Sequence, residues 1–310
     1  MPKLTRKRLI LAKIETTYGT DPTPTGSANA ILIKNLDVTP IAATLVGRDL
    51  IRTYLGEFDQ LIANNHVECN FEVEIAGAGA AGTAPAYGPL LRACGLSETI
   101  SAGVSVTYAP ISASFESVTI YYQVDGIQHK ITGARGSVDL DITANQIPVY
   151  KFKFVGIYNA PTDTALATPT YTGFTTPLVA NNTNTTGFSF FSVSGLVLES
   201  LMLSVNNTVD FRALIGSEYA QLTDRRSSGE VNFEAPTLAT FNTFSTALGT
   251  TTGALDITHG TAGGNKVQVT ASKVDIGQPS YADSQGVVMI KCPFFVLPSS
   301  GNDEFAIVVK

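Results

Sequence analysis

The side chains most able to do chemistry are carboxylates that recur at every second residue. Glu72 and Glu74 form one such pair, and Asp139 and Asp141 form another. On a β-strand, residues two apart point to the same face, so each pair would present neighbouring carboxylates. Such groups can act as general acid and base or bind a cation. Neighbours on one strand lie too close for most glycosidase mechanisms, so a glycosidase is the least favoured hypothesis.

Other residues that catalyse reactions or bind metals are few. The three histidines have no ligand-like spacing, which favours exposed polar side chains over metal ligands. The three cysteines are far apart and odd in number, which predicts buried free thiols made in a reducing cytoplasm. These six residues are His66, His129, His259, Cys69, Cys94 and Cys292. No nucleophile elbow, Walker loop or dinucleotide fingerprint occurs in a convincing context. The sequence therefore predicts no catalytic residue, metal or cofactor.

The acidic residues belong to a longer pattern that occurs twice in the same order. The matching segments are Arg48-Asp49-Leu50-Ile51 with Arg212-Ala213-Leu214-Ile215, Val67-Glu68-Cys69-Asn70-Phe71-Glu72 with Gly229-Glu230-Val231-Asn232-Phe233-Glu234, and Val138-Asp139-Leu140 with Val274-Asp275-Ile276. Several matches in one order predict two related domains, and two copies are too few for a solenoid.

This repetition argues against catalysis at the carboxylates. Glu72 and Asp139 recur as Glu234 and Asp275, and a single catalytic site would not need the second set. Two interpretations remain open at this point. The acidic face is either the solvated side of an antiparallel sheet, or it lines a shared surface where negative charge is useful.

Composition limits the class of protein further. The chain has 310 residues, a net charge of −6 and only 15% charged residues, with no tryptophan. This mixture is typical of β-rich structural proteins, and it does not favour non-specific DNA binding over the whole surface. The apolar run after the basic start is too short for a signal peptide, and no stretch approaches the ~20 apolar residues of a membrane span.

The predicted organisation has four parts. Residues 1–30 form an N-terminal arm that docks on something else, residues 31–158 form copy 1, residues 159–187 form a linker or long surface loop, and residues 188–310 form copy 2. The last residues, 305–310, are apolar and are expected to add a strand to a sheet.

The pattern within the two copies predicts strands and one short helix in each. Strict alternation over 67–75 predicts a half-buried strand, and further strands are expected over 149–158 and 286–297. Helices are expected over 87–95 and from Pro236, with one buried face in each. The expected apolar faces are Tyr87, Leu90, Leu91 and Cys94 in the first helix, and Leu238, Phe241, Phe244 and Leu248 in the second.

The leader adds a resemblance to a known family. Glu15-Thr16-Thr17-Tyr18-Gly19-Thr20-Asp21-Pro22, followed by Gly26 and Ala28-Asn29-Ala30-Ile31-Leu32, resembles the start of major tail proteins of long-tailed, non-contractile phages. The order of the later elements is similar to that family over essentially the full length. The resemblance implies an all-β fold with minor α: two tandem β-sandwich/barrel domains, each with one flanking helix, that give strands to an oligomeric β-barrel tube.

The same resemblance implies a structural, non-enzymatic function. The family's subunits form rings that stack into the tail tube, which encloses the tape measure protein and conducts DNA during ejection. A duplicated chain would form trimeric rings with pseudo-sixfold symmetry, and hexameric rings are the alternative. Expected partners are further copies of the chain, the tape measure protein, tail terminator and distal tail or baseplate proteins, and double-stranded DNA in transit without specific binding. No membrane is expected. The chain would be made in the bacterial host cytoplasm and reside in the virion tail.

In this family the channel wall is typically acidic, and a long loop and terminal arm bridge neighbouring rings. The candidates for channel-lining residues are Glu68, Glu72, Glu74, Asp139, Asp141, Glu230, Glu234 and Asp275. The candidates for contacts between rings are Lys3, Arg6, Arg8, Tyr18, Arg48, Arg52 and Tyr54. Lys151, Lys153 and Lys291 are expected to add positive charge to the same channel.

A second class of function has some support. A two-domain surface adhesin or carbohydrate-binding module would also be β-rich, acidic and duplicated. Such a protein is expected to carry a secretion signal and an exposed aromatic platform, and the sequence shows no clear case of either.

Overall fold

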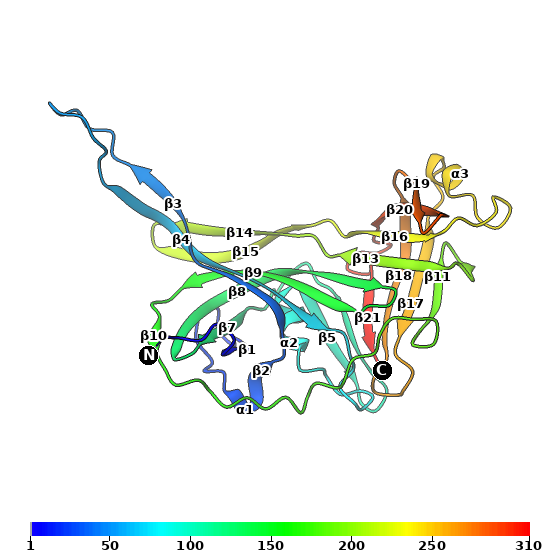
Figure 1. Cartoon of the computed structure of the whole chain (residues 1–310), viewed down its shortest axis with the longest axis horizontal. Coiled ribbons are helices and arrows are strands. Elements are labelled where there is room, and N and C mark those ends of the chain that lie inside the picture. The colour runs from blue at the N-terminus through cyan, green and yellow to red at the C-terminus, as the bar shows by residue number, and fades with distance from the viewer. Residues whose placement is uncertain (1) are drawn as a thin grey trace.

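The computed structural model describes residues 2–310, and nearly all regular structure in that range is β-strand (Figure 1). This confirms the predicted all-β class with minor α. The strands up to residue 163 are β1 (Arg8–Ile14), β2 (Ala30–Ile31), β3 (Lys34–Gly47), β4 (Gln60–Glu74), β5 (Leu96–Ser101), β6 (Ser105–Pro110), β7 (Val118–Val124), β8 (Ile127–Thr143), β9 (Val149–Tyr158) and β10 (Thr162–Asp163).

The remaining strands and the helices complete the described chain. The strands are β11 (Thr185–Phe190), β12 (Val193–Ser194), β13 (Leu198–Ser204), β14 (Asn207–Leu214), β15 (Ser217–Arg225), β16 (Ser228–Glu234), β17 (Gly253–His259), β18 (Val267–Ile276), β19 (Ser280–Ser284), β20 (Val287–Val296) and β21 (Ala306–Val309). The helices are α1 (Gly26–Asn29), α2 (Gly88–Ala93) and α3 (Thr243–Leu248). We call residues 31–158 the first half and residues 188–310 the second half.

One continuous sheet, which we call the main sheet, passes through both halves. In the first half its strands run in the order β3, β4, β9, β8, and in the second half β13, β16, β20. The halves join where Asp139–Thr143 of β8 pairs with Ser200–Ser204 of β13. Beyond β20, the main sheet ends in the last residues of β18 and in β19. The sheet therefore has no break at the join between the halves.

A second layer covers the apolar side of the main sheet. In it, β1 pairs with β7 and β11 pairs with β17. Residues 8–14 of the predicted docking arm pack on the chain itself, because Leu9, Ile10, Leu11 and Ala12 are buried in this layer. Burial of these apolar side chains stabilises the fold by about 0.8 kcal/mol per buried CH₂.

The core between the layers is one contiguous cluster that spans both halves. In the first half, Phe71 lies with its ring centroid 5.7 Å from that of Phe152. In the second half, Phe190 lies 5.8 Å from Phe294. Each fully buried phenylalanine stabilises the fold by roughly 1.5–3 kcal/mol. Phe71 and Phe152 are neighbours within the main sheet, whereas the contact of Phe190 on β11 with Phe294 on β20 joins the second layer to the main sheet.

The segments outside the two halves also pack on them. Residues 164–184 run as an extended loop along the molecule, where Ala167 and Tyr171 pack against the second layer (Figure 1). The predicted terminal strand is present as β21, which pairs with β6 of the first half and β18 of the second. A sheet in the second layer therefore also links the halves.

The Gly/Ala-rich loop after β4 forms a close seam with the turn between β17 and β18. Gly79 N donates a hydrogen bond to Gly264 O at 2.9 Å, and Gly77 N donates to Asn265 Oδ1 at 2.6 Å. A Cβ at Gly77 would lie 2.1 Å from Gly264 O, which no side chain can tolerate. Glycine is therefore required here because two backbones touch.

Both predicted helices are present, as α2 and α3, but they differ in packing. In α2, Leu90 and Leu91 are fully buried, as expected. The second helix begins later than expected, and of its predicted face only Phe241 is classed as buried while Leu238 and Leu248 are 62% and 91% exposed. The predicted buried face of this helix is wrong for the isolated chain.

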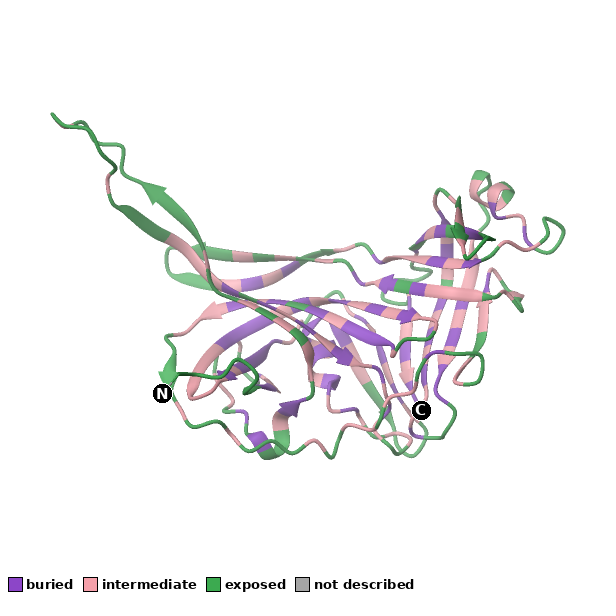
Figure 2. Ribbon diagram, viewed as in Figure 1, coloured by how far each residue is buried: buried purple, intermediate pink, exposed green. Residues whose placement is uncertain are grey.

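Two long hairpins leave the main sheet at the same end. The first hairpin, residues 40–65, is formed by the ends of β3 and β4 and projects into solvent. The second hairpin, residues 207–225, is formed by β14 and β15 and lies across the first half (Figure 1). Figure 2 shows the contrast, with the outer part of the first hairpin exposed and part of the second buried.

Candidate functional site: an acidic face of the main sheet

Strand β4 separates its apolar and acidic residues by simple alternation. Val67, Cys69, Phe71 and Val73 are buried, while the residues between them lie on the other face. That outer row is His66, Glu68, Asn70, Glu72 and Glu74. Because strand residues alternate in direction, the acidic row must face away from the core. The predicted half-buried strand is confirmed, with the acidic residues on its outer side.

Registers in the first half bring the other predicted carboxylates to the same face. Glu72 lies opposite Lys151 on β9, and Lys151 lies opposite Asp139 on β8. Asp141 lies opposite Val149, which lies opposite Glu74. Directly opposed residues in antiparallel strands point to one face, so these carboxylates form one surface.

The second half continues this surface with the same pairing. Asn70 lies opposite Lys153 in the first half, and Asn232 lies opposite Lys291 in the second. Glu230 and Glu234 flank Asn232 on β16, as Glu68 and Glu72 flank Asn70 on β4. At the join, Asp141 lies opposite Met202. We call this common surface the acidic face.

Asp275 does not occupy the position that the repeat predicts. It lies opposite Phe295, whereas Asp139 lies opposite Lys151. Val118 of β7 pairs with Ala134 of β8, and Gly253 of β17 pairs with Val274 of β18. Along its own strand, Asp275, which follows Val274, therefore matches Arg135, which follows Ala134. The equivalence of Asp275 with Asp139 is therefore wrong. Asp275 still points outward, but at the hairpin end of the main sheet.

Lysines are interleaved with the carboxylates, as expected. Lys151 Nζ lies 2.7 Å from Asp141, Lys153 Nζ lies 3.4 Å from Asp139, and Lys291 Nζ lies 3.2 Å from Glu230. The hydrogen bond to Asp141 raises the pKa of Lys151. Since these pairs are part exposed, each contributes only about 0–1 kcal/mol to stability. Carboxylates outnumber lysines on the acidic face, so it remains negative.

Two carboxylates on this face were not singled out from the sequence. Asp37 of β3 lies opposite Asn70. Glu199 accepts hydrogen bonds from Asn232 Nδ2 and, at 2.7 Å, from Ser284 Oγ. The alternation of apolar and polar residues around Val38 could have identified Asp37 as an outward-facing carboxylate. Glu199 had no such signal, because the register shifts between Leu198 and Ser200.

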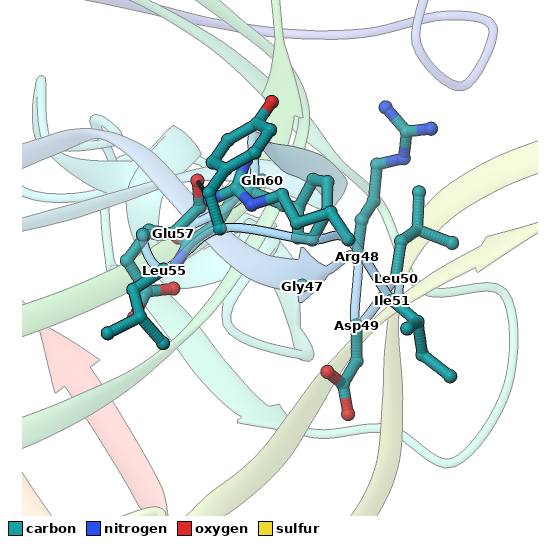
Figure 3. Close-up of a pocket in the computed structure, with 12 residues that line it drawn as sticks. Gly47, Arg48, Asp49, Leu50, Ile51, Leu55, Glu57 and Gln60 are labelled. Carbon is teal, nitrogen blue, oxygen red and sulfur yellow. Dashed lines mark hydrogen bonds between the residues drawn. The ribbon is translucent and has the colours of Figure 1, made fainter.

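The candidates for ring-to-ring contact fall in separate places. Arg48, Arg52 and Tyr54 lie in the tip of the first hairpin, where Arg48 pairs with Asp59 at 2.9 Å and Arg52 lies over the Tyr54 ring. The tip forms a shallow hollow, and the side chains of Leu50 and Ile51 project from its backbone (Figure 3). Ile51 is fully exposed.

The basic leader residues lie elsewhere. Lys3 Nζ donates to Asp125 O at 3.1 Å, next to the turn between β7 and β8, and Arg6 and Arg8 are exposed nearby in the chain. Tyr18 is half-buried, and its hydroxyl donates to Gly133 O at 3.0 Å and accepts from Ala220 N at 2.7 Å. Within the isolated chain Tyr18 thus holds the second hairpin.

The cysteines and two of the histidines pack against other side chains of the fold. All three cysteines are buried free thiols, as predicted, and burial raises the pKa of Cys69 and of Cys292 to about 12. His66 stacks on Phe211 and His129 on Tyr122. Within residues 2–310, no cluster of three potential metal ligands occurs, and no helix has the length and apolar character needed to cross a membrane.

The acidic face is suited to electrostatics rather than to converging acid–base chemistry. Its carboxylates are spread over five strands, β3, β4, β8, β13 and β16, in repeating rows instead of gathering in a cleft. On this face, His66 Nε2 lies 3.5 Å from a carboxylate oxygen of Glu68. A long negative surface repels polyanions and attracts cations over roughly one Debye length, about 8–10 Å at physiological salt.

Comparison with known proteins agrees with this geometry. A search of curated proteins gave no significant match to the chain. The family model described as phage tail tube protein matches residues 5–294, which is nearly the whole chain and includes every carboxylate of the acidic face. The chain therefore belongs to the phage tail tube protein family, a family of structural proteins of the virion tail.

Proposed function

We propose that this chain polymerises as stacked rings into the tail tube, which encloses the tape measure protein and later conducts DNA. Three chains would form each ring, with the two halves of each chain filling six similar positions. The matched registers of Asn70 with Lys153 and of Asn232 with Lys291 support treating the halves as two copies.

The observation that carries the proposal is the join between β8 and β13. Within one chain, the second half adds its first main-sheet strand to the last one of the first half. At the two ends of the main sheet, β3 pairs only with β4 and β19 only with β20 among the described strands. Free edges at both ends invite pairing with another strand. Repeating the internal join between chains would use both edges and close a ring.

The acidic face would line the channel of such a ring. DNA carries one negative charge per ~1.7 Å of helix axis, so a negative wall keeps it from adhering during passage. The interleaved lysines reduce the charge without reversing it. The carboxylates would then serve repulsion, and we propose that they have no catalytic role.

Further partners follow from the position of the chain in the tail. The ends of the tube would contact a tail terminator on one side and distal tail or baseplate proteins on the other. The buried free thiols suit synthesis in the reducing cytoplasm of the bacterial host.

Electron microscopy of the purified chain tests the proposal. Hollow tubes or three-lobed rings are expected, with the acidic face inside. Monomers under all assembly conditions, or the acidic face on the outer surface of the tube, would contradict it. Six-chain rings would retain the tube but replace the trimer with the hexamer.

The wall can be tested separately by charge reversal. Changing Glu68, Glu72, Glu230 and Glu234 to lysine is expected to leave tube formation intact and to make the tubes retain DNA. The matched change of the same four residues to glutamine removes charge without reversing it, and should give much weaker retention. Equal DNA retention by tubes of the unmodified chain would exclude the repulsive wall.

A further inference from the structure

The second hairpin, which belongs to the second copy of the domain, packs on the first copy. Phe211 stacks on His66 of β4 with ring centroids 5.0 Å apart. Arg135 Nη1 of β8 donates to Ala220 O at 3.0 Å. Ala220 and Leu222 are buried in this contact. The hairpin is therefore seated on the outer row of the main sheet, at the end where that row begins.

The base of the same hairpin is tied to the first half by polar contacts. Asn207 Nδ2 donates to Gly136 O at 3.0 Å and to Cys94 O at 2.6 Å, just past α2. Arg225 donates to Ile111 O of the first half at 2.6 Å and also pairs with Glu304 of the second half at 2.7 Å. Hydrogen bonds from a charged donor such as Arg225 are stronger than those between neutral groups, so the contact is specific as well as apolar.

The first hairpin resembles the second in its construction, but among the described residues it packs on no surface of its own chain. Its base pair Thr44–Ala63 corresponds to Asn207–Arg225, and the two enclosed segments are nearly equal in length. Its paired residues Val46 and Leu61 are 47% and 54% exposed. Apolar pairs of this kind, on a hairpin that projects alone, indicate a surface that is covered in the assembly.

The second half has an exposed surface at the place that matches the seat. His66 lies opposite Ile157 in the first half, and Ser228 lies opposite Phe295 in the second. Phe295 is 55% exposed. Leu248, at the end of α3, is 91% exposed, whereas the corresponding end of α2 is buried. These exposed residues occupy the site that the hairpin covers in the first half.

Charged side chains also lie on both surfaces. In the first half Arg135, which lies opposite Val155, donates to a backbone carbonyl of the second hairpin, and Asp275 lies opposite Phe295 in the second half. The tip of the first hairpin carries Arg48 and Arg52 together with Asp49, Glu57 and Asp59, so it has no excess of positive charge. The exposed apolar residues, rather than net charge, therefore argue for the contact.

We propose that the first hairpin of each chain lies across the second half of the neighbouring chain in the same ring. Arg48 would lie over Ser228 and near Asp275, and the Val46–Leu61 pair would cover Phe295 and the end of α3. The proposed occupant is a second copy of this chain. The inference rests on the proposed ring, but it adds a contact that ring closure through β3 does not require.

Chemical cross-linking of assembled tubes tests the contact. Cysteines are placed by Arg48→Cys and Ser228→Cys in one chain, and tubes are treated with a short bismaleimide. The native cysteines are buried and should not react. We expect cross-linked species that stop at the number of chains in one ring, which is three for the trimer. The matched control joins the pair already in contact, His66→Cys with Phe211→Cys, and should cross-link within single chains only.

The possible outcomes separate this contact from the function itself. Tubes without cross-links between chains, or a ladder of cross-linked species without an upper limit, would overturn the hairpin contact but leave the tube in place. A chain that never forms rings or tubes would overturn both.

A second pair of variants covers the case in which the cysteines block assembly. Phe295→Glu should raise the protein concentration needed for ring formation at least tenfold, while the melting temperature of the dilute chain stays unchanged. Phe295→Leu keeps the site apolar and should assemble nearly as well as the original chain. Equal assembly by Phe295→Glu and Phe295→Leu would contradict the proposed cover.

Discussion

The first and second hairpins have related tips and nearly equal lengths beyond the matched base pairs Thr44–Ala63 and Asn207–Arg225, yet they differ in what surrounds them. Both tips carry an Arg-x-Leu-Ile sequence, and Ile51 and Ile215 are both fully exposed. Along their shafts the hairpins diverge. Leu222 of the second hairpin is 6% exposed, whereas Leu61 of the first is 54% exposed.

This difference separates contacts that a chain makes alone from contacts that await a partner. The second hairpin finds its seat because the first half precedes it in the same chain. The first hairpin has no earlier copy to lie on. Similar local sequence therefore gives one buried and one exposed hairpin, and the distinction lies in the neighbour rather than in the hairpin itself.

The largest expected effect compares the two leucines directly. Leu222→Ala should lower the free energy of unfolding of the dilute chain by about 2–3 kcal/mol, because it opens a cavity under the second hairpin. Leu61→Ala should change it by no more than about 0.5 kcal/mol, because the side chain is already in solvent. Urea unfolding measures both values, and equal losses would remove the contrast between the hairpins.

A smaller effect is expected at Tyr18. Tyr18→Phe removes the hydroxyl that joins Gly133 O to Ala220 N and leaves the Ala220 N–H without this acceptor. The expected loss is about 1–3 kcal/mol in urea unfolding. Tyr54→Phe is the matched control on the exposed tip, and it should have no measurable effect. A loss at Tyr54 as large as that at Tyr18 would contradict the comparison.

The same tyrosine predicts a dependence on alkaline pH. Burial raises the pKa of Tyr18 above its ordinary value of 10.0. The unfolded chain therefore loses this proton first, and the stabilising effect is present below pH 10 and falls as the pH rises towards the folded pKa. Unfolding of the original chain and of Tyr18→Phe between about pH 9 and about pH 11 should show a steeper loss in the original chain. Parallel curves would show that Tyr18 ionises alike in both states.

The smallest effect is expected at the Arg48–Asp59 pair. The two side chains are 46% and 61% exposed. Arg48→Ala should therefore lower the stability of the dilute chain by less than about 0.5 kcal/mol, as measured by thermal unfolding. A loss above about 1 kcal/mol would show that the tip of the first hairpin is packed within its own chain.

Local periodicity made much of the fold predictable from the sequence. The alternation at Val67–Ile75 identified β4 and its acidic side, and a strand over 149–158 was correct to the residue. These inferences succeed because the two-residue period of a strand is a property of the segment itself. The outward placement of Glu68, Glu72 and Glu74 follows directly from that period.

Other features depend on residues far away in the chain. The pairing of β21 with β6 and the seat of Tyr18 join segments that share no local pattern. Asp275 was matched to Asp139 because the short motif repeats, but the strand is interrupted around Pro279 before the corresponding level is reached. The helical period around Leu248 was real, yet the period says only that one face is apolar. It does not say whether the same chain covers that face.

The glycine seam between Gly77 and Gly264 gives the proposed tube an uneven stiffness. The Gly/Ala loop that forms this seam occurs in the first half only, so it fastens the two halves of one chain but has no equivalent between chains. In a ring of three chains, rigid and compliant joints would then alternate. Deformation of such a ring would concentrate at its three compliant joints.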